Sequence, residues 1–196
     1  MDGFVIDILR DDLLIEIQTK SFSSMKRKLL KLTEDHKIRL IHPIAAKKWI
    51  VRLDTDGETQ LSRRKSPKHG CVEDVFDELV SFPQLLMHPN FSLEVLLIHE
   101  DELRVHSNKR GWRRKGWVIH ERRLIDVVGS HVYHTPADMC VFTPESLPSP
   151  FTTADLADIT GQPRRQAQKM AYCLKGMGTI VPVGKQGNAI CYDRAA

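Results

Sequence analysis

The chain of 196 residues has no apolar run that approaches the length of a membrane-spanning helix, and its first residues show no secretory-signal pattern. Cysteine is scarce, because only Cys71, Cys140, Cys173 and Cys191 are present, and no two of them form a Cys-x-x-Cys pair. Free thiols in a reducing compartment are therefore expected, rather than a disulfide framework. These absences predict a cytoplasmic protein that makes no contact with a membrane.

Motifs of several large enzyme classes are also absent. The chain has no phosphate-binding loop, no dinucleotide fingerprint and no signature of a serine or cysteine nucleophile. Its composition, 41% hydrophobic and 28% charged, is typical of soluble globular proteins, and its length allows one domain or two small ones. The net charge of +4 is modest, so the placement of the charges is more informative than their sum.

The start of the chain carries the most informative pattern. Two apolar runs, residues 4–9 and 13–18, flank a short polar turn and predict a β-hairpin. Each run contains one carboxylate, Asp7 in the first and Glu16 in the second. A carboxylate among buried strand residues is costly unless a partner neutralises it, and two on neighbouring strands indicate a shared divalent cation. The alternative is an ordinary hairpin whose acids face solvent.

This arrangement resembles the PD-(D/E)xK nuclease superfamily, in which one strand carries Asp and the next carries Glu-x-Lys. Asp7 matches the Asp, Glu16 matches the Glu, and Gln18 stands where lysine is usual. The resemblance implies that Asp7, Glu16 and the Ile17 carbonyl hold Mg²⁺ or Mn²⁺, and that Gln18 orients the attacking water. It also implies that the next helix sets a basic residue near the metal. Lys26 is the candidate, with a solvated surface lysine as the alternative.

Cores of this superfamily usually begin with a helix and one further strand before the Asp-bearing strand. Only six residues precede Asp7, so both elements are missing from the predicted nuclease-like domain. The sequence is then truncated, or another chain supplies these elements, or the domain is a reduced one. Because an uncovered strand edge tends to pair with something, a homo-oligomer or a partner protein is expected to complete the core.

The rest of the first two-thirds predicts an α/β fold with a restriction-endonuclease-like mixed sheet and flanking helices. In the helix expected after the hairpin, Met25, Leu29 and Leu32 share one face. A strand parallel to the Glu16 strand is expected to follow it. The full set comprises helices over residues 21–34 and 72–87, strands over 38–44, 49–53 and 93–98, and two strands within 117–133 around Gly129.

A Pro-rich stretch, residues 144–150, predicts a linker. Two helical patterns over 151–160 and 164–175 and a Gly-rich hairpin over 179–192 follow it, with Leu156 and Ile159 expected to face inward. This order resembles a winged helix-turn-helix domain. The resemblance divides the chain into a nuclease-like domain, residues 1–134, and a winged helix domain, residues 135–196. The alternative is a winged domain used only for protein contacts.

Basic residues that are candidates for nucleic-acid contact gather in three places. Two are Pro- or Gly-bounded loops at residues 62–70 and 109–117, the second with two tryptophans that can stack on bases; a solvated turn is the alternative for each. The third follows from the resemblance, which places the second C-terminal helix near the major groove and the wing near a phosphate. The candidates are Arg63, Arg64, Lys65, Arg113, Arg114, Arg164, Arg165, Gln168, Lys169 and Lys185.

Together these features predict a DNA-binding protein that hydrolyses phosphodiesters with Mg²⁺, a metal-dependent deoxyribonuclease to which the winged helix delivers duplex. The alternative is a catalytically inactive nuclease-like module that binds DNA or a protein. Gln18 in place of lysine and the missing first helix and strand favour this alternative. The residues decide neither between DNA and RNA nor the site cut, the partner, or a role in defence, repair or regulation.

Overall fold

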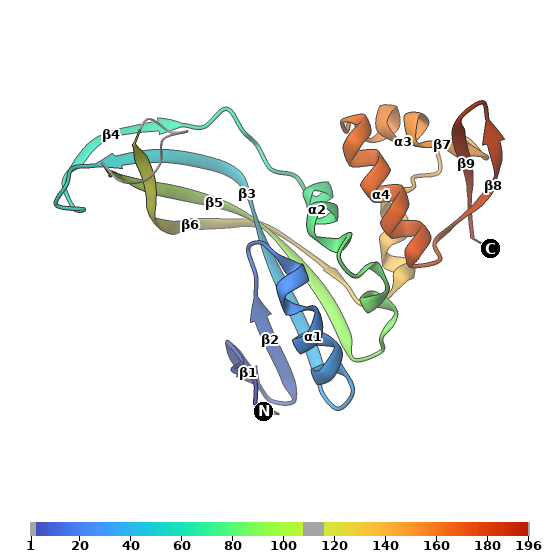
Figure 1. Cartoon of the computed structure of the whole chain (residues 1–196), viewed down its shortest axis with the longest axis horizontal. Helices are drawn as coiled ribbons and strands as arrows, with labels where there is room; N and C mark the ends of the chain where they lie inside the picture. Colours follow the sequence, from blue (N-terminus) through green and yellow to red (C-terminus); the bar gives the residue numbers. More distant parts are fainter. Residues whose placement is uncertain (1–2, 108–115, 196) are drawn as a thin grey trace. The chain divides into compact units, whose positions relative to one another are not determined.

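The computed structural model describes residues 3–107 and 116–195 (Figure 1). Its contacts divide the chain into two units, which we call unit 1 (residues 1–42, 73–95 and 131–196) and unit 2 (residues 43–72 and 96–130). This division does not follow the expected boundary after residue 134, because residues 131–196 belong to the same unit as the N-terminal hairpin. Independent folding of residues 1–134 and 135–196 stays a prediction.

The main sheet is mixed and has six strands, in the order β1-β2-β3-β5-β6 with β4 paired to β3. β1 (Ile8–Arg10) runs antiparallel to β2 (Leu13–Ile17), and β2 runs parallel to β3 (Lys37–Leu53) across α1 (Phe22–Thr33). β4 (Gln60–Lys65) is antiparallel to the second part of β3. β5 (Phe91–His106) and β6 (Trp117–Tyr133) complete the sheet and establish an α/β fold.

Strand β3 differs from the expectation of two strands at residues 38–44 and 49–53. It is a single strand that continues through Pro43, so the two-strand prediction was wrong. Its pairing with β2 ends at Ile41 and its pairing with β4 begins at Trp49, so Pro43 lies in the interval between the two partners. A missing amide is tolerated best where no ladder hydrogen bond is required, which explains how a proline fits inside this strand.

The helix expected over residues 72–87 is broken into short pieces. A 3₁₀ turn, η1 (Val72–Val75), leads into α2 (Phe76–Leu79), and a second 3₁₀ turn, η2 (Pro83–Met87), follows. Phe82 has an extended φ of −160° directly before Pro83, whose ring cannot continue a helix. The expected apolar positions Val75, Leu79 and Phe82 are nevertheless buried.

Strand β6 also corrects the sequence analysis, which divided residues 117–133 into two strands around Gly129. It runs without interruption from Trp117 to Tyr133, with Gly129 inside it. A Cβ built at Gly129 would make only ordinary contact with Leu97 of β5, at 3.6 Å, so the glycine is not required by a close approach. The glycine therefore did not mark the end of a strand.

The C-terminal elements agree with the expected helices and hairpin. A 3₁₀ turn, η4 (Pro136–Phe142), precedes β7 (Phe151–Thr152), α3 (Thr153–Thr160), α4 (Arg164–Gly176), β8 (Ile180–Gln186) and β9 (Ala189–Arg194). β9 pairs with both β7 and β8 to form a second, three-stranded sheet. The Thr152 hydroxyl caps α3 while Asp155 bonds back to the Thr152 amide, and Leu156 is buried as expected. Ile159 is exposed, so its inward placement was wrong.

Each unit has its own apolar core. Unit 1 buries α1 through Met25, Leu29 and Leu32, the three positions that its periodicity predicted. The Phe22 ring stacks on that of Phe82, with 5.7 Å between their centroids. Unit 2 has a smaller cluster, formed by Val51, Leu53, Leu103 and Val105. Within residues 3–107 and 116–195, no helix is long and apolar enough to cross a membrane.

Candidate acidic site and nucleic-acid interface

The two expected metal ligands lie across the β1–β2 hairpin. β1 begins at Ile8, which pairs with Ile15, so Asp7 lies in a bend just before the strand that was expected to contain it. Asp7 is exposed, and its Oδ2 accepts a hydrogen bond of 2.9 Å from the amide of Ile17. Glu16 is only 3% exposed. Asp7 is therefore tied to the residue that follows Glu16, and a cation shared by the two carboxylates stays a prediction.

A lysine from α1 reaches the buried carboxylate. The Lys28 amine lies 2.5 Å from Oε1 of Glu16 and also donates to the carbonyl oxygen of Val5. This Oε1 is buried, and the ammonium of Lys28 is its one polar contact among the described residues. Asp7, Glu16 and Lys28, which we call the acidic site, therefore combine two carboxylates with one ammonium group.

The sequence analysis proposed Lys26 as the basic residue at this site. Lys26 is exposed, and Lys28 is the residue that contacts Glu16. Helical spacing alone did not separate the two lysines, because each lies three or four residues from buried residues of α1: Lys26 from Phe22 and Leu29, and Lys28 from Met25 and Leu32.

The end of β2 is held by its neighbours in unit 1. The Gln18 amide donates to the carbonyl of Ile41 at 2.9 Å, and the Gln18 carbonyl accepts from Nδ1 of His42 at 2.7 Å. His42 is buried with its ring edge-on to Phe22, and this burial lowers the pKa of its imidazole, against the weaker opposing effects of the Gln18 carbonyl, Glu78 and Asp74. His42 therefore stays neutral and anchors the strand that carries Glu16.

A metal site made only of protein ligands is not evident. Among the described residues, no group of three or more His, Cys, Asp or Glu side chains could together hold a metal ion. Mg²⁺ often binds through one or two carboxylates together with water and substrate phosphates, so a two-carboxylate site remains chemically suitable. The assignment of Asp7, Glu16 and the Ile17 carbonyl as ligands stays a prediction.

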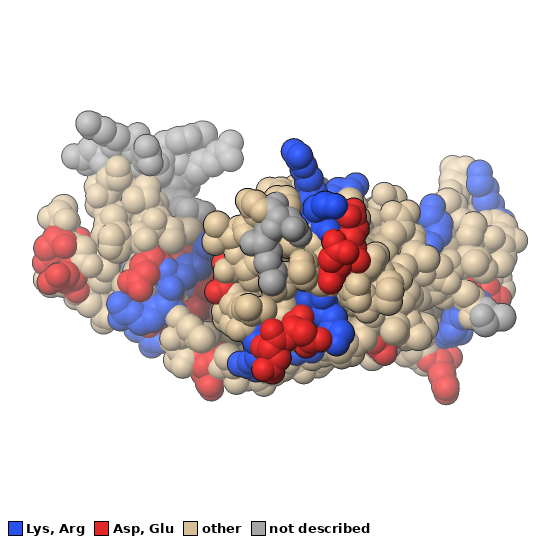
Figure 2. Space-filling model, turned by 90° about the horizontal axis from the view of Figure 1, so that it is seen from below, with Lys and Arg blue, Asp and Glu red and all other residues tan. Residues whose placement is uncertain are grey.

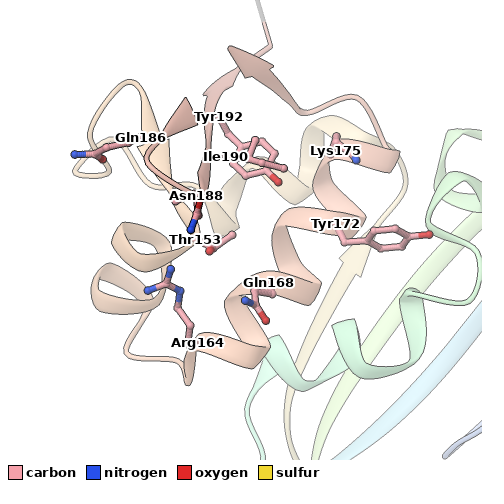
Figure 3. Close-up of a pocket in the computed structure, with 10 residues that line it drawn as sticks. Thr153, Arg164, Gln168, Tyr172, Lys175, Gln186, Asn188, Ile190 and Tyr192 are labelled. Atoms are coloured by element: carbon pink, nitrogen blue, oxygen red, sulfur yellow. The ribbon is translucent and has the colours of Figure 1, made fainter. Parts of the chain in front are cut away.

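The second candidate site is a hollow of about 570 Å³ between α4, the start of α3 and the β8–β9 hairpin (Figure 3). We call it the α4 hollow. Arg164 and Lys175 provide its positive charge, and no Asp or Glu is among the residues that line it. Its lining consists of Thr153, Arg164, Gln168, Tyr172, Lys175, Gln186, Asn188, Ala189, Ile190 and Tyr192.

The orientation of α4 follows from its two faces. One face buries Ala167, Met170, Ala171 and Leu174 in unit 1. The other exposes Arg164, Gln168, Tyr172 and Lys175, which succeed one another at intervals of four, four and three residues and so form one stripe. The sequence analysis named Arg164 and Gln168 but missed Tyr172 and Lys175, although this spacing was sufficient to find them.

The remaining candidates on this segment lie outside the hollow. The Lys169 amine contacts Oδ1 of Asp77 at 2.6 Å, so the lysine is held against the η1–α2 segment. Gln166, next to the candidate Arg165, is buried and donates to the carbonyl of Glu73 at 2.6 Å. Arg165 is exposed on α4, and Lys185 is exposed on β8 beside Gln186.

The candidates in unit 2 have different surroundings. Arg63 contacts Asp101 at 3.0 Å, and its guanidinium lies over the ring of Trp49, 4.6 Å from the centroid. Arg64 and Lys65 are exposed on β4, and no ion pair is recorded for them within the part of the chain that the structure describes. Arg113 and Arg114 lie outside the described residues.

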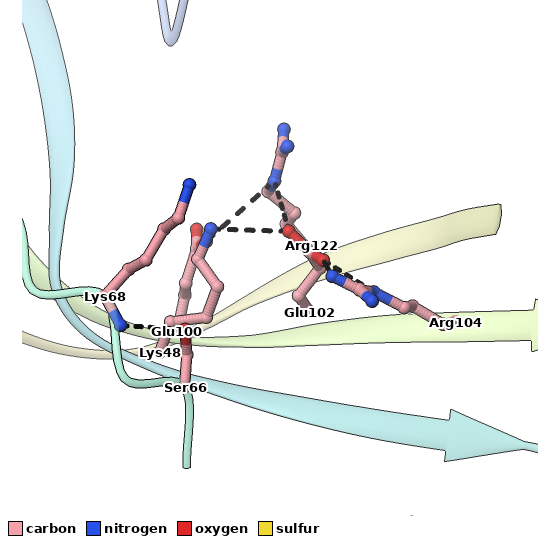
Figure 4. Close-up of polar contacts among 7 residues, drawn as sticks. All are labelled: Lys48, Ser66, Lys68, Glu100, Glu102, Arg104 and Arg122. Atoms are coloured by element: carbon pink, nitrogen blue, oxygen red, sulfur yellow. Dashed lines mark hydrogen bonds and ion pairs between the residues drawn. The ribbon is translucent and has the colours of Figure 1, made fainter. Parts of the chain in front are cut away.

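Unit 2 also contains a charged network that the sequence analysis did not find (Figure 4). The Lys48 amine lies 3.1 Å from Glu100 and 3.3 Å from Glu102, two buried acids of β5. Nε of Arg122 lies 3.9 Å from each of these acids, and Arg104 donates to Glu102. We call these five residues the carboxylate network. Glu100, Glu102 and Arg104 alternate along β5, but Lys48 and Arg122 come from other strands, and no local pattern predicts that they join the network.

The ionisation of Glu102 shows how this network is balanced. Burial is the largest single influence and acts to raise the pKa of this carboxyl. The hydrogen bonds and charges of Arg104 and Lys48 together outweigh burial, so the pKa lies below its ordinary value. Glu102 is therefore an anion that its cationic neighbours hold in place.

Charges of both signs are mixed on the surface as well. Figure 2 shows one face of the molecule, on which Lys and Arg side chains are interspersed with Asp and Glu rather than gathered in a single patch. The described residues on this face form no continuous basic surface that marks a nucleic-acid site (Figure 2). The α4 hollow is distinguished instead by the absence of acids from its lining.

Comparison with known proteins gives relatives without an assigned activity. Residues 1–134 match a family model described as a domain of unknown function (DUF8091). The chain is also 29% identical, over 194 residues, to an uncharacterized protein of Treponema pallidum (strain Nichols), a match that covers 98% of this chain and 76% of the relative. No solved structure matches the chain.

Proposed function

The chain belongs to the DUF8091 family, a domain of unknown function, and from the geometry of its α4 hollow we propose that it binds double-stranded DNA. The observation that carries this proposal is the stripe of Arg164, Gln168, Tyr172 and Lys175, which faces the β8–β9 hairpin across a hollow lined without acids. In this reading residues 135–196 form a winged helix domain, α4 enters the major groove, and the hairpin is the wing.

The chemistry of the stripe suits a duplex better than a small neutral ligand. Arg164 and Lys175 stand near opposite ends of α4, where each can neutralise a backbone phosphate. Gln168 lies between them with an amide that can both donate and accept at base edges. Asn188 on the hairpin adds a second amide, so the hollow offers phosphate and base contacts together.

The proposal is tested by the salt dependence of DNA binding. Each neutralised phosphate releases condensed counterions, so removing one contact reduces the slope of log K against log salt by about 0.9. The double variant Arg164→Ala/Lys175→Ala is expected to weaken duplex binding at least tenfold and to flatten the slope by nearly two such steps. Fluorescence anisotropy with a labelled duplex, titrated at several salt concentrations, measures both quantities.

Lys169→Ala is the matched control, since it removes a lysine from the same helix that Asp77 already holds. It is expected to leave both the affinity and the slope close to those of the wild type. Equal effects of the double variant and the control would contradict the assignment of the α4 hollow. An affinity for DNA that is unchanged in both variants would instead assign the DNA contact to Arg63, Arg64 and Lys65, or to Arg113 and Arg114.

A second function, metal-dependent phosphodiester hydrolysis, is favoured by the acidic site. Its support is the buried carboxylate of Glu16, which has one cationic partner among the described residues, together with the exposed Asp7, whose Oδ2 accepts from the amide of Ile17 next to Glu16. In the nuclease superfamily that the hairpin resembles, a lysine usually follows the Glu by two positions, where Gln18 stands here. Lys28 brings an amine to the same carboxylate from α1 instead.

These residues fit a hard divalent cation in their donor type. Mg²⁺ would be held by the carboxylates of Asp7 and Glu16 and by the Ile17 carbonyl, and when bound it would supply activation of water and neutralisation of phosphate charge. Gln18 lies two residues after Glu16, directly after the end of β2, and can orient a water molecule there. Lys28 can offset negative charge at the phosphate once it is released from Glu16.

Calorimetric titration of Mn²⁺ or Mg²⁺ combined with a duplex-cleavage assay tests this second function. Wild type is expected to bind the cation and to cleave, whereas Glu16→Gln and Asp7→Asn should lose both properties and keep their affinity for DNA. Glu34→Gln is the control, because Glu34 is an exposed glutamate paired with Lys31 on α1. Absence of both heat and cleavage in the wild type would leave the inactive DNA-binding module as the function.

A further inference from the structure

Three strands form the edges of the main sheet in the part of the chain that the structure describes, and they differ in protection. β1 has only three residues, and β4 carries Arg63, Arg64 and Lys65 along its edge. Short length and charged side chains are the usual means by which proteins keep an edge strand from pairing with another molecule. β6 is the least protected of the three, because it is 17 residues long and its residues 124–128 are apolar except for Asp126.

The apolar side chains of β6 lie on the surface. Leu124 is 58% exposed, Ile125 46%, Val127 47% and Val128 46%. Adjacent residues of a strand point to opposite faces of a sheet, so exposure at consecutive positions means that this segment is uncovered on both faces as well as at its edge. An apolar surface of this kind typically marks a site of protein association.

The order of charges around this segment indicates that its partner is a second copy of the chain. Arg122 and Arg123 precede Leu124 and Ile125, and Asp126 follows them. If two copies of β6 pair antiparallel about Leu124 and Ile125, Arg123 of each copy lies opposite Asp126 of the other. A parallel pairing would instead place arginine beside arginine. No proline interrupts residues 117–133, so the main chain of this edge can form a ladder.

We propose that β6 is a dimerisation edge, at which a second copy of this chain pairs antiparallel with residues around Leu124 and Ile125 and joins the two main sheets into one. The interface is isologous, as a two-fold axis requires, since the same apolar centre and the same flanking charges come from both copies. The proposal concerns the edge opposite to β1 in the sheet, and it is independent of whether the chain binds DNA.

Sedimentation equilibrium of the full chain tests the proposal. Unit 2 contains fifteen Lys or Arg and eight Asp or Glu, counted from the sequence, so the measurement is made at about 0.3 M salt to screen repulsion between copies. The wild type is expected to dimerise with increasing concentration. Leu124→Lys/Ile125→Lys is expected to raise the dimer dissociation constant at least a hundredfold.

Leu61→Lys is the matched control, because Leu61 is 55% exposed on β4, the other edge of unit 2. It is expected to leave the dissociation constant unchanged. Circular dichroism verifies that each variant is folded. Because Asp126→Arg changes only an exposed charge, it provides a second variant that is expected to weaken the dimer even if the double lysine variant does not fold.

A charge reversal makes the test specific for the antiparallel arrangement. Adding Arg123→Asp to Asp126→Arg restores opposite charges across the two-fold axis and is expected to recover most of the lost affinity. A wild type that stays monomeric up to about 100 μM, which corresponds to a weak association of roughly 5.5 kcal/mol, would overturn the proposal. A dimer that is insensitive to all changes at residues 123–126 would overturn it equally.

Discussion

The two units bury glutamate in different ways. In unit 1 a single lysine, Lys28, contacts Glu16, with its amine 2.5 Å from Oε1. In unit 2, Lys48 bridges two glutamates, Glu100 and Glu102, and two arginines contact them as well. A carboxylate held by several cations is fixed in the fold, whereas one with a single, partly exposed lysine can exchange that partner for a metal ion. The comparison therefore points to Glu16, rather than Glu102, as the residue to test with cations.

The units also differ in net charge, and this difference is misleading when taken alone. Counted from the sequence, unit 2 has seven more basic than acidic residues, whereas unit 1 has three more acidic than basic ones. Several of the unit 2 cations are nevertheless committed to the carboxylate network or to Asp101. The α4 hollow, lined without acids, belongs to the more acidic unit. Local pairing, rather than the sum of charges, indicates where an anionic ligand can bind.

The largest effect is expected from Glu102→Gln. Loss of this charge leaves Lys48, Arg104 and Arg122 close together with only Glu100 to offset them, so the free energy of unfolding should fall by about 2–3 kcal/mol. Urea unfolding at neutral pH measures it. Glu121→Gln is the control, because Glu121 is an exposed partner of Arg123 whose loss should cost about 0–1 kcal/mol. Equal losses would show that the network is not a structural element.

A smaller loss is expected from Glu16→Gln, about 1–2 kcal/mol, because Lys28 is partly exposed and can turn its amine to water. The same variant sharpens the comparison between the two glutamates. Mn²⁺ should raise the thermal unfolding midpoint of the wild type and of Glu102→Gln, but not that of Glu16→Gln, since only a ligand that binds the native state stabilises it. A midpoint that shifts equally in all three proteins would exclude Glu16 as a ligand.

Loss of the α3 cap is expected to cost about 1 kcal/mol. Thr152→Ala removes the hydroxyl that accepts from the amides of Ala154 and Asp155, which urea unfolding can detect. The cap also has a pH dependence, because hydrogen bonds from Thr152 lower the pKa of Asp155 in the folded chain. This stabilisation is complete above the ordinary pKa of Asp and is lost as pH falls through the lower folded value. Thr153→Ala, next in sequence, should have little effect on either quantity.

The smallest effect concerns His42. Burial lowers the pKa of its imidazole below the ordinary value of 6.5, so the unfolded chain binds a proton that the folded chain does not. Stability should be complete above that value and should decrease as pH falls below it. The urea midpoint of the wild type is therefore expected to fall between about pH 7.5 and pH 5.5. His42→Asn, which keeps a donor near the Gln18 carbonyl, should flatten this dependence, whereas exposed His69→Asn should not.

Local sequence patterns predicted what depends on local physics. Helical periodicity identified the buried face of α1, and capping residues together with glycines identified α3, α4 and the hairpin that follows. Pro43 and Gly129 were wrongly predicted to mark strand boundaries, because both residues lie inside long strands. Whether a proline or glycine ends a strand depends on which neighbour pairs at that position, and the sequence does not show that neighbour.

The candidate site shows the same difference between features that depend on local sequence and contacts between distant residues. The β1–β2 hairpin was predictable from its two apolar runs and the polar turn between them, although β1 begins at Ile8 and Asp7 lies just before it. The contact between Glu16 and Lys28 did not follow from helical spacing, because Lys26 and Lys28 both lie beside buried residues of α1. The pairing of Lys48 with Glu102 was not predictable, because 54 residues separate the two and only the completed sheet brings them together.

The interleaving of the units has a consequence during protein synthesis. Unit 2 consists of residues 43–72 and 96–130, with a part of unit 1 between them in sequence. A ribosome must therefore translate as far as β6 before the strands of unit 2 can all pair, while β9, the last strand of unit 1, emerges later still. Such long sequence separations between contacting residues slow folding. Nascent chains of intermediate length should consequently expose β5 without β6 and depend on chaperones more than a chain of two consecutive domains would.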